Sequence, residues 1–148
     1  MNILTMPNTI LTTRSTDVTE FEIMPFIFEE MVKTAVENEL VGLASNQVGF
    51  TNRFFIATVH GEFKLFVNPK YKGNTQVGEK FKWEGCGSIP NISCLVKRFE
   101  SVTVTAQDST GKIFNDVLWG SDARVFQHEN DHLNGVLITS KAREKRRV

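Results

Sequence analysis

The segment from Gln127 to His132 reads Gln-His-Glu-Asn-Asp-His and contains a His-Glu-x-x-His pattern. On a helix, His128 and His132 lie on one face about a turn apart, so their imidazoles can bind one metal ion with Glu129 beside it. A metal in such a site lowers the pKa of a bound water to about 7, and the glutamate carries protons. Since the chain has only three histidines, chance is a weak explanation for this spacing. The pattern predicts metal-assisted hydrolysis.

Two histidines leave a tetrahedral metal one protein ligand short. Downstream, the one acidic or imidazole side chain is Glu144, which lies in a basic tail and is a poor candidate for a buried ligand. Upstream, the candidates are His60, Cys86 and Cys94. His60 precedes a glycine between two apolar runs, and this pattern indicates a solvated hairpin turn. Cys86 is flanked by glycines that let the backbone approach a small site, and a thiolate binds zinc or iron well.

Around these candidates the chain resembles a known family, the peptide deformylases. Its members have three motifs in order, roughly Gly-x-Gly-Leu-Ala-Ala-x-Gln, Glu-Gly-Cys-Leu-Ser and Gln-His-Glu-x-Asp-His. This sequence has Leu-Val-Gly-Leu-Ala-Ser-Asn-Gln at 40–47, Glu-Gly-Cys-Gly-Ser at 84–88, and the third motif at 127–132. The resemblance extends over nearly the whole chain. Three ordered motifs are far more specific than His-Glu-x-x-His alone.

Three residues depart from these motifs: Leu40 replaces the first glycine, Ser45 the second alanine, and Gly87 the leucine after the cysteine. Ser45 is a small change. Leu40 puts a bulky side chain beside Val41 and Gly42, whose backbone groups we expect to bind the substrate main chain in strand-like fashion. Gly87 keeps its backbone N–H but gains conformational freedom. We therefore expect a working but looser oxyanion hole, and restoring leucine at position 87 should not reduce turnover if φ is negative there.

The resemblance implies hydrolysis of the N-formyl group of the starting methionine of a nascent peptide, which releases formate. It implies one divalent metal ion with three ligands: Cys86, His128 and His132. Iron(II) is favoured in the cell, while zinc, nickel or cobalt also suits these ligands. Glu129 would carry the proton to the leaving nitrogen. Gln47 and the backbone N–H of Gly87 would donate hydrogen bonds to the oxyanion.

Other charged residues of the motifs have supporting roles in this interpretation. We expect Asp131 to accept a hydrogen bond from a ligand imidazole or from the helix end. Glu84, Arg98 and Arg124 would form a buried ion network that holds the two metal-bearing segments, or else pair at the surface.

Two helices are expected. The first would start at a Thr-x-x-Glu capping box at 19–22, with Pro25 in its first turns, and would run to about Glu39. The second would begin near 121–122, where Ser or Asp can cap it, and end near 134–135 at a glycine.

Strands are expected between and after these helices. Apolar runs and alternation predict them at 54–59, 65–67, 92–96, 102–106 and 113–118. Strands around one metal-bearing helix make an α+β fold, and the resemblance implies antiparallel strands packed around that central helix. A chain of 148 residues fits a single catalytic domain, 1–148.

The composition limits the kinds of partner that the chain can be expected to bind. Lysine plus arginine equals aspartate plus glutamate at 17 each, so no overall charge attracts DNA or an anionic membrane. No apolar run has the length of a membrane span and no export signal is evident, so we expect a cytoplasmic protein with free thiols. We also expect it to be a monomer. The basic tail at 141–147 is typical of a solvated chain end, or of a segment that contacts ribosomal RNA.

Three other functions are compatible with parts of this pattern. A structural zinc site could combine Cys86 and Cys94 with both histidines, although the seven residues between the cysteines exceed the usual spacing. A protein with this fold could bind formylated peptide ends without hydrolysing them. A zincin-like protease would need a downstream ligand that the sequence does not offer.

Overall fold

The structure is a computed structural model that describes residues 1–148. Its helices are α1 (Met24–Glu37), α2 (Gly120–Leu133) and α3 (Ile138–Lys141), with 3-10 turns at Thr9–Thr12 and Ser45–Val48. Its strands are β1 (Gly42–Ala44), β2 (Phe54–Val59), β3 (Glu62–Gly73), β4 (Glu79–Cys86), β5 (Ile89–Phe99), β6 (Ser101–Gln107), β7 (Ile113–Trp119) and β8 (Glu144–Arg147).

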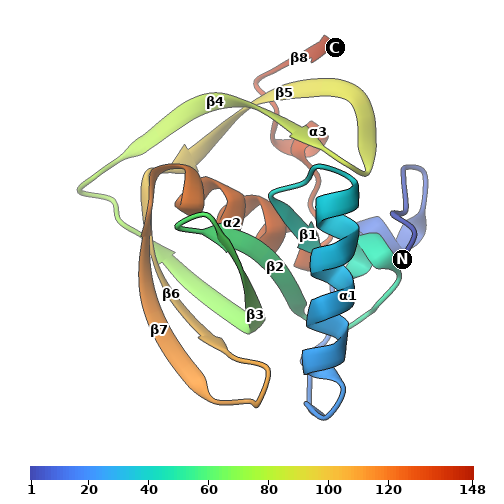
Figure 1. Cartoon of the computed structure of the whole chain (residues 1–148). Coiled ribbons are helices and arrows are strands. Elements are labelled where there is room, and N and C mark those ends of the chain that lie inside the picture. The colour runs from blue at the N-terminus through green and yellow to red at the C-terminus, as the bar shows by residue number, and fades with distance from the viewer.

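The strands form two antiparallel sheets around α2. One sheet has the order β1-β2-β3-β6-β7 and the other the order β4-β5-β8. Figure 1 shows α2 near the centre of the molecule, with the five-stranded sheet curving around it and β4 and β5 passing over it. The predicted α+β fold, with antiparallel strands around a central helix, is confirmed.

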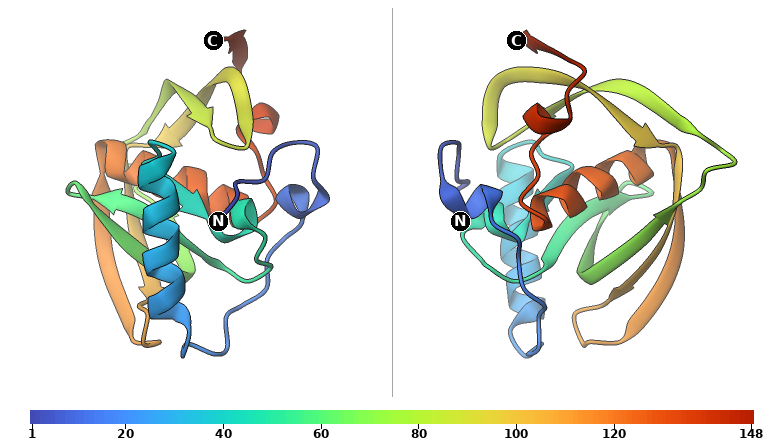
Figure 2. Two further views of the ribbon diagram at one scale, coloured as in Figure 1. Left: turned by 45° about the vertical axis from the view of Figure 1, so that its right-hand side comes forward. Right: turned by 180° about the vertical axis from the view of Figure 1, so that it is seen from behind.

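The strand β2 is buried on both faces because a helix covers each one. Phe55 faces α2, and its ring centroid lies 5.1 Å from that of Phe126. The neighbouring Ile56 faces the other way, into a cluster that includes Met31 of α1. Successive side chains of a strand point to opposite faces. The unbroken apolar run at 54–59 therefore fits a strand between two helices, which the views in Figure 2 also show.

The expected start of the first helix is wrong. The helix α1 begins at Met24, with Pro25 in its first turn, and the predicted capping box at 19–22 does not form. A helix starting at 19–22 would place Pro25 in its interior, where the ring would clash with the preceding turn. At the other end, Glu39 adopts a left-handed φ of 56°, and the N–H of Leu40 donates to the carbonyl of Ala35.

The helix α2 starts slightly earlier than expected and ends as predicted. It begins at Gly120 without a side-chain cap, since the carboxylate of Asp122 instead accepts the backbone N–H of His60 at the β2–β3 turn. It ends at Leu133, and Gly135 follows with a positive φ of 71°. The predicted hairpin turn at His60 is confirmed, with the histidine side chain 89% exposed.

The strands differ from their predicted limits, most clearly at β3 and in the C-terminal tail. The strand β3 continues past 65–67 to Gly73, because a register shift between Val67 and Lys70 accommodates Asn68-Pro69. The basic tail forms β8, which pairs with β5 and has exposed side chains throughout. None of the helices has the length and hydropathy that a membrane span requires.

Candidate metal centre and active site

Three possible metal ligands meet between α2 and the end of β4. His128 and His132 lie one turn apart on α2, with ring centroids separated by 5.1 Å. The Sγ atom of Cys86 lies 3.3 Å from Nε2 of His132. One ligand atom from each of the three residues lies within 4.8 Å of the other two. The second cysteine, Cys94, is outside this cluster, fully buried among apolar side chains on β5.

A tight hairpin brings Cys86 to this position. Cys86 ends β4 and pairs with Ile89 at the start of β5, so only Gly87 and Ser88 form the turn. Ser88 is fixed to the N-terminal segment: its hydroxyl donates to the carbonyl of Leu4 at 2.6 Å. The turn therefore sets the thiol against α2.

The carboxylate of Glu84 orients His128. It accepts Nε and Nη2 of Arg98 at 2.9 and 3.0 Å, a hydrogen bond from Arg124, and Nδ1 of His128 at 3.0 Å. Because an ionised carboxylate can only accept, Nδ1 carries the proton and Nε2 is left to face the cluster. The predicted buried network of Glu84, Arg98 and Arg124 is confirmed, and His128 is the member that the sequence did not reveal.

Asp131 does not take the role expected of it. Its carboxylate accepts Nη1 of Arg98 at 2.6 Å and Nζ of Lys141 at 3.1 Å, and it bonds neither imidazole. The carboxylate beside the imidazole is Glu84 instead. It lies two residues before Cys86 on one strand, and side chains at that spacing point to the same face. That spacing is the signal by which the sequence could have identified it.

Burial and charge set the protonation of the two imidazoles. Burial lowers the pKa of His132 well below its usual value, and the charges of His128 and Arg98 lower it further. Burial also acts to lower the pKa of His128, but the charge of Glu129 and hydrogen bonds to Cys86 and Glu84 raise it to about 10. Because an imidazole binds a metal in its neutral form, the lowered pKa of His132 favours its role as a ligand.

Glu129 points into the same site. Its carboxylate is buried, and Oε1 has no hydrogen-bond partner. Burial raises the pKa of Glu129 to about 7, against the opposing charges of His128 and Arg98. A Cβ atom at Gly42 would lie 2.5 Å from Oε2 of Glu129. Glycine at this position therefore makes room for the carboxylate.

Gln47 is held with its amide nitrogen toward the cluster. Its Oε1 accepts the backbone N–H of Ala44 at 2.9 Å, and its Nε2 donates to the hydroxyl of Ser88 at 3.1 Å. The same Nε2 lies 3.8 Å from Sγ of Cys86. The backbone N–H of Gly87 has no acceptor within the protein. Two N–H donors thus lie beside the cluster, and the N–H of Gly87 is the one without an acceptor.

A cavity of about 210 Å³ joins these groups. Its lining includes seven of the predicted site residues: Val41, Gly42, Gln47, Cys86, Gly87, His128 and Glu129. The eighth, His132, is buried beneath it in the ligand cluster. Ser45, one of the departures from the family motifs, is buried, and its hydroxyl donates to the carbonyl of Asn52 at 2.6 Å.

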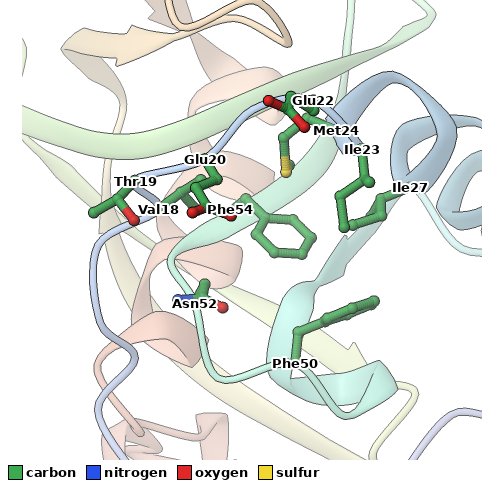
Figure 3. Close-up of a pocket in the computed structure, with 10 residues that line it drawn as sticks. All are labelled: Val18, Thr19, Glu20, Glu22, Ile23, Met24, Ile27, Phe50, Asn52 and Phe54. Atoms are coloured by element: carbon green, nitrogen blue, oxygen red, sulfur yellow. The ribbon is translucent and has the colours of Figure 1, made fainter.

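Another cavity, of about 250 Å³, lies beside the start of α1 and is mainly apolar. In Figure 3 the side chains of Ile27, Phe50 and Phe54 face a common space there. No histidine or cysteine lines it, so it offers none of the ligands that the sequence suggested.

The chemistry of the donors fits a divalent transition metal. One thiol and two imidazoles are the ligands that zinc and iron(II) accept, and a three-ligand set leaves a coordination position open, as hydrolytic metal sites require. An unpaired buried carboxylate beside that position can move protons. The fold and this site define a metal-dependent hydrolase.

Comparison with known proteins specifies the family. The family model for polypeptide deformylase matches residues 1–148. The peptide deformylase of Thermotoga neapolitana is 37% identical over 143 residues, which cover 94% of this chain and 85% of that protein. Peptide deformylase 1 of Corynebacterium glutamicum is 37% identical over 137 residues, covering 89% and 80%.

Solved structures support the same family assignment. The crystal structure of peptide deformylase from Thermotoga maritima superposes with a TM-score of 0.92 at 34% identity and covers 97% of both chains. That of a probable peptide deformylase from Synechococcus phage S-SSM7 gives a TM-score of 0.88 at 33% identity, covering 95% of this chain and 99% of the other. The chain belongs to the peptide deformylase family, metal-dependent hydrolases that remove the N-formyl group from nascent peptides.

The two cysteines should differ sharply when each is changed to serine. Cys86→Ser removes the thiol from the cluster, so bound metal should fall below one equivalent after dialysis, or the bound metal should lose its thiolate absorption. Cys94→Ser should keep one equivalent, since this thiol only packs in the core. Metal content by atomic emission and the spectrum of the cobalt-loaded protein measure this. Equal metal loss from both variants would favour a closed four-ligand site.

Proposed function

We propose that this chain hydrolyses the formamide of N-formylmethionyl peptides, with Glu129 as the proton carrier and with Gln47 and the backbone of Gly87 as oxyanion donors. The observation that supports this most strongly is the convergence of three kinds of group on one cavity. They are a Cys/His/His cluster, an unpaired buried carboxylate and two N–H donors. A hydrolase of amides needs all three.

The cluster would hold one divalent ion through Cys86, His128 and His132. We propose iron(II) in the cell, with zinc, nickel and cobalt as alternatives that the same donors accept. When bound, the ion supplies Lewis acidity that makes water a nucleophile at neutral pH. The hydrogen bond from His128 to Glu84 supports this assignment, because it fixes the imidazole with Nε2 toward the cluster.

Glu129 takes a proton from the attacking water and passes it to the leaving nitrogen. The C–N bond of the formamide then breaks, and the products are formate and the free amine. The pKa of about 7 suits both steps, because a group that titrates near the working pH accepts and donates protons with similar ease. The absence of any other partner for Oε1 leaves it free to do so.

Gln47 and Gly87 stabilise the oxyanion that forms when the carbonyl carbon becomes tetrahedral. An amide and a backbone N–H do not titrate, so both remain donors over the whole working pH range. The two bonds that fix the Gln47 side chain support its role, since a donor held in place needs no reorganisation during the reaction.

Val41 and Gly42 bind the substrate main chain. Gly42 belongs to β1, the edge strand of the five-stranded sheet, and Val41 precedes it. An edge strand offers unpaired N–H and C=O groups to an extended peptide. We propose that the peptide pairs with this edge and thereby places its formyl group in the cavity.

Residues 1–148 would act as one catalytic domain and as a monomer, since a single chain supplies every group of the site. A thiol ligand and a second free cysteine suit a reducing compartment, and we propose that the protein works in the cytoplasm. Neither DNA nor a membrane has a role in this proposal.

The strand β8 is a candidate contact with the ribosome, where formylated peptides emerge. Its basic side chains Lys145, Arg146 and Arg147 are exposed, and the guanidinium of Arg146 lies 4.0 Å from the ring centroid of Trp83. A basic surface with an exposed aromatic ring suits ribosomal RNA.

Glu129→Gln should separate proton transfer from metal binding. The variant keeps the size of the side chain but cannot accept a proton, so formate release from formyl-Met-Ala-Ser should fall by about 10²-fold or more. Metal content should be unchanged. Asp122→Asn on the same helix, outside the cavity, is the control and should match the parent. Near-full turnover of Glu129→Gln would refute the mechanism, and loss of metal would show that Glu129 is a ligand.

Reversing the charge of β8 should weaken ribosome binding without affecting chemistry. The triple change of Lys145, Arg146 and Arg147 to glutamate should abolish salt-sensitive co-sedimentation with ribosomes, while kcat/KM on the free tripeptide stays unchanged. A matched triple charge reversal is available elsewhere on the surface: Lys33, Lys70 and Lys72. Equal effects of both triples would indicate a general charge effect and contradict a specific contact.

A further inference from the structure

Two departures from the family motifs, Leu40 and Gly87, meet at the cavity although 46 residues separate them in sequence. A Cβ atom built at Gly87 would lie 3.5 Å from both Cδ1 and Cδ2 of Leu40, and 4.0 Å from Cγ2 of Ile3. No other heavy atom is as close as the two methyl groups of Leu40. The side chain of Leu40 therefore occupies the space toward which a side chain at position 87 would point.

In the observed arrangement, a leucine side chain at position 87 would start in contact with Leu40. A distance of 3.5 Å is already van der Waals contact for a Cβ atom alone. A leucine adds three further carbons beyond Cβ, the first about 1.5 Å away, given ordinary carbon bond lengths. The motifs have glycine at position 40 and leucine at 87, whereas this chain has the reverse. The larger residue at position 40 is thus matched by the smaller residue at position 87.

We propose that Leu40 and Gly87 are an exchanged pair, in which Leu40, in the connection between α1 and β1, supplies the apolar wall that position 87 lacks. This inference rests on the proposed function, and makes Leu40 a positioning residue for the oxyanion donor. Gly87 has no side chain, and its N–H makes no hydrogen bond within the protein. The Leu40 side chain is what limits the movement of this peptide group on the cavity side.

Leu40 is well held for this purpose. Its N–H donates to the carbonyl of Ala35 at 2.9 Å, and its side chain packs against the apolar cluster beneath α1. The next residue, Val41, accepts the N–H of Thr58 at 2.9 Å. A side chain whose backbone is fixed in this way can limit how far a facing loop moves toward it.

The pairing leads to a prediction for Gly87→Leu that differs from the one based on the sequence alone. The backbone does not forbid leucine, since Gly87 is not among the glycines with positive φ. The available space is what opposes leucine, because a Cβ atom at position 87 would already contact Leu40. Gly87→Leu alone should therefore displace the turn or Leu40 and reduce activity.

A double-mutant cycle on the metal-loaded full chain tests the proposal. Formate release from formyl-Met-Ala-Ser is measured for the parent, Leu40→Gly, Gly87→Leu and the double variant. Each single change should lower kcat/KM about tenfold, a coupling within the range seen for contacting residues. The double variant should return to within about threefold of the parent. In Leu40→Gly the loss should fall mainly on kcat, because a misplaced oxyanion donor weakens the transition state.

A second readout does not depend on turnover. Thermal midpoints of the four chelator-treated proteins should show the same pattern, with both single variants lowered and the double variant recovered. Leu40→Met, which refills the space, should recover most of what Leu40→Gly loses. Val77→Gly, on an exposed turn remote from the cavity, is the control for loss of an aliphatic side chain.

The pairing would be overturned if the losses of the two single variants in kcat/KM and in thermal midpoint simply added in the double variant. So would a Gly87→Leu variant as active and as stable as the parent. If the metal-loaded parent released no formate, the proposed function would fail, and the thermal midpoints would still decide whether the two residues are coupled.

Discussion

The buried carboxylate of Glu84 is the interaction on which the site depends. Burial alone would raise its pKa, but hydrogen bonds from His128 and Arg98 bring the pKa of Glu84 well below its usual range. A buried charge is tolerated only when it is fully paired, and here two guanidinium groups and an imidazole share one carboxylate. Removing one partner would leave uncompensated charge, so β4, β5 and α2 are held in one arrangement.

This constraint explains how a polar helix can occupy the centre of the molecule. Five of the eight buried residues of α2 are polar, and most are bonded to the surrounding strands or loops. Gln127 pairs with the backbone of Phe99 through both its amide oxygen and nitrogen, and the carbonyl of His132 accepts Nδ2 of Asn46 at 2.6 Å. Three buried polar atoms of α2 have no partner: Oε1 of Glu129, Oδ1 of Asn130 and Nδ1 of His132. Of these three residues, only Glu129 has a carboxylate, and it is the residue that we assign to proton transfer.

The sequence predicted what depends on local spacing. The helical period placed His128, Glu129 and His132 on one face, and alternation identified the strand at 102–106. It failed where a local signal competes with a stronger constraint, as when Pro25 overrides the capping box at 19–22. It also could not show contacts between distant segments. Leu40 and Gly87 read as two separate defects of the motifs, because only the fold brings them together.

The metal affinity of Glu84→Gln tests most directly whether this carboxylate organises the centre. The change keeps the shape but removes the charge that orients His128, so the affinity for zinc in a chelator competition should fall 10- to 100-fold, as for other partners of ligand imidazoles. Circular dichroism should confirm that the variant is folded. Glu79→Gln, which removes an exposed carboxylate on the same strand, should bind zinc as the parent does. Unchanged affinity in a folded Glu84→Gln would contradict the role assigned to Glu84.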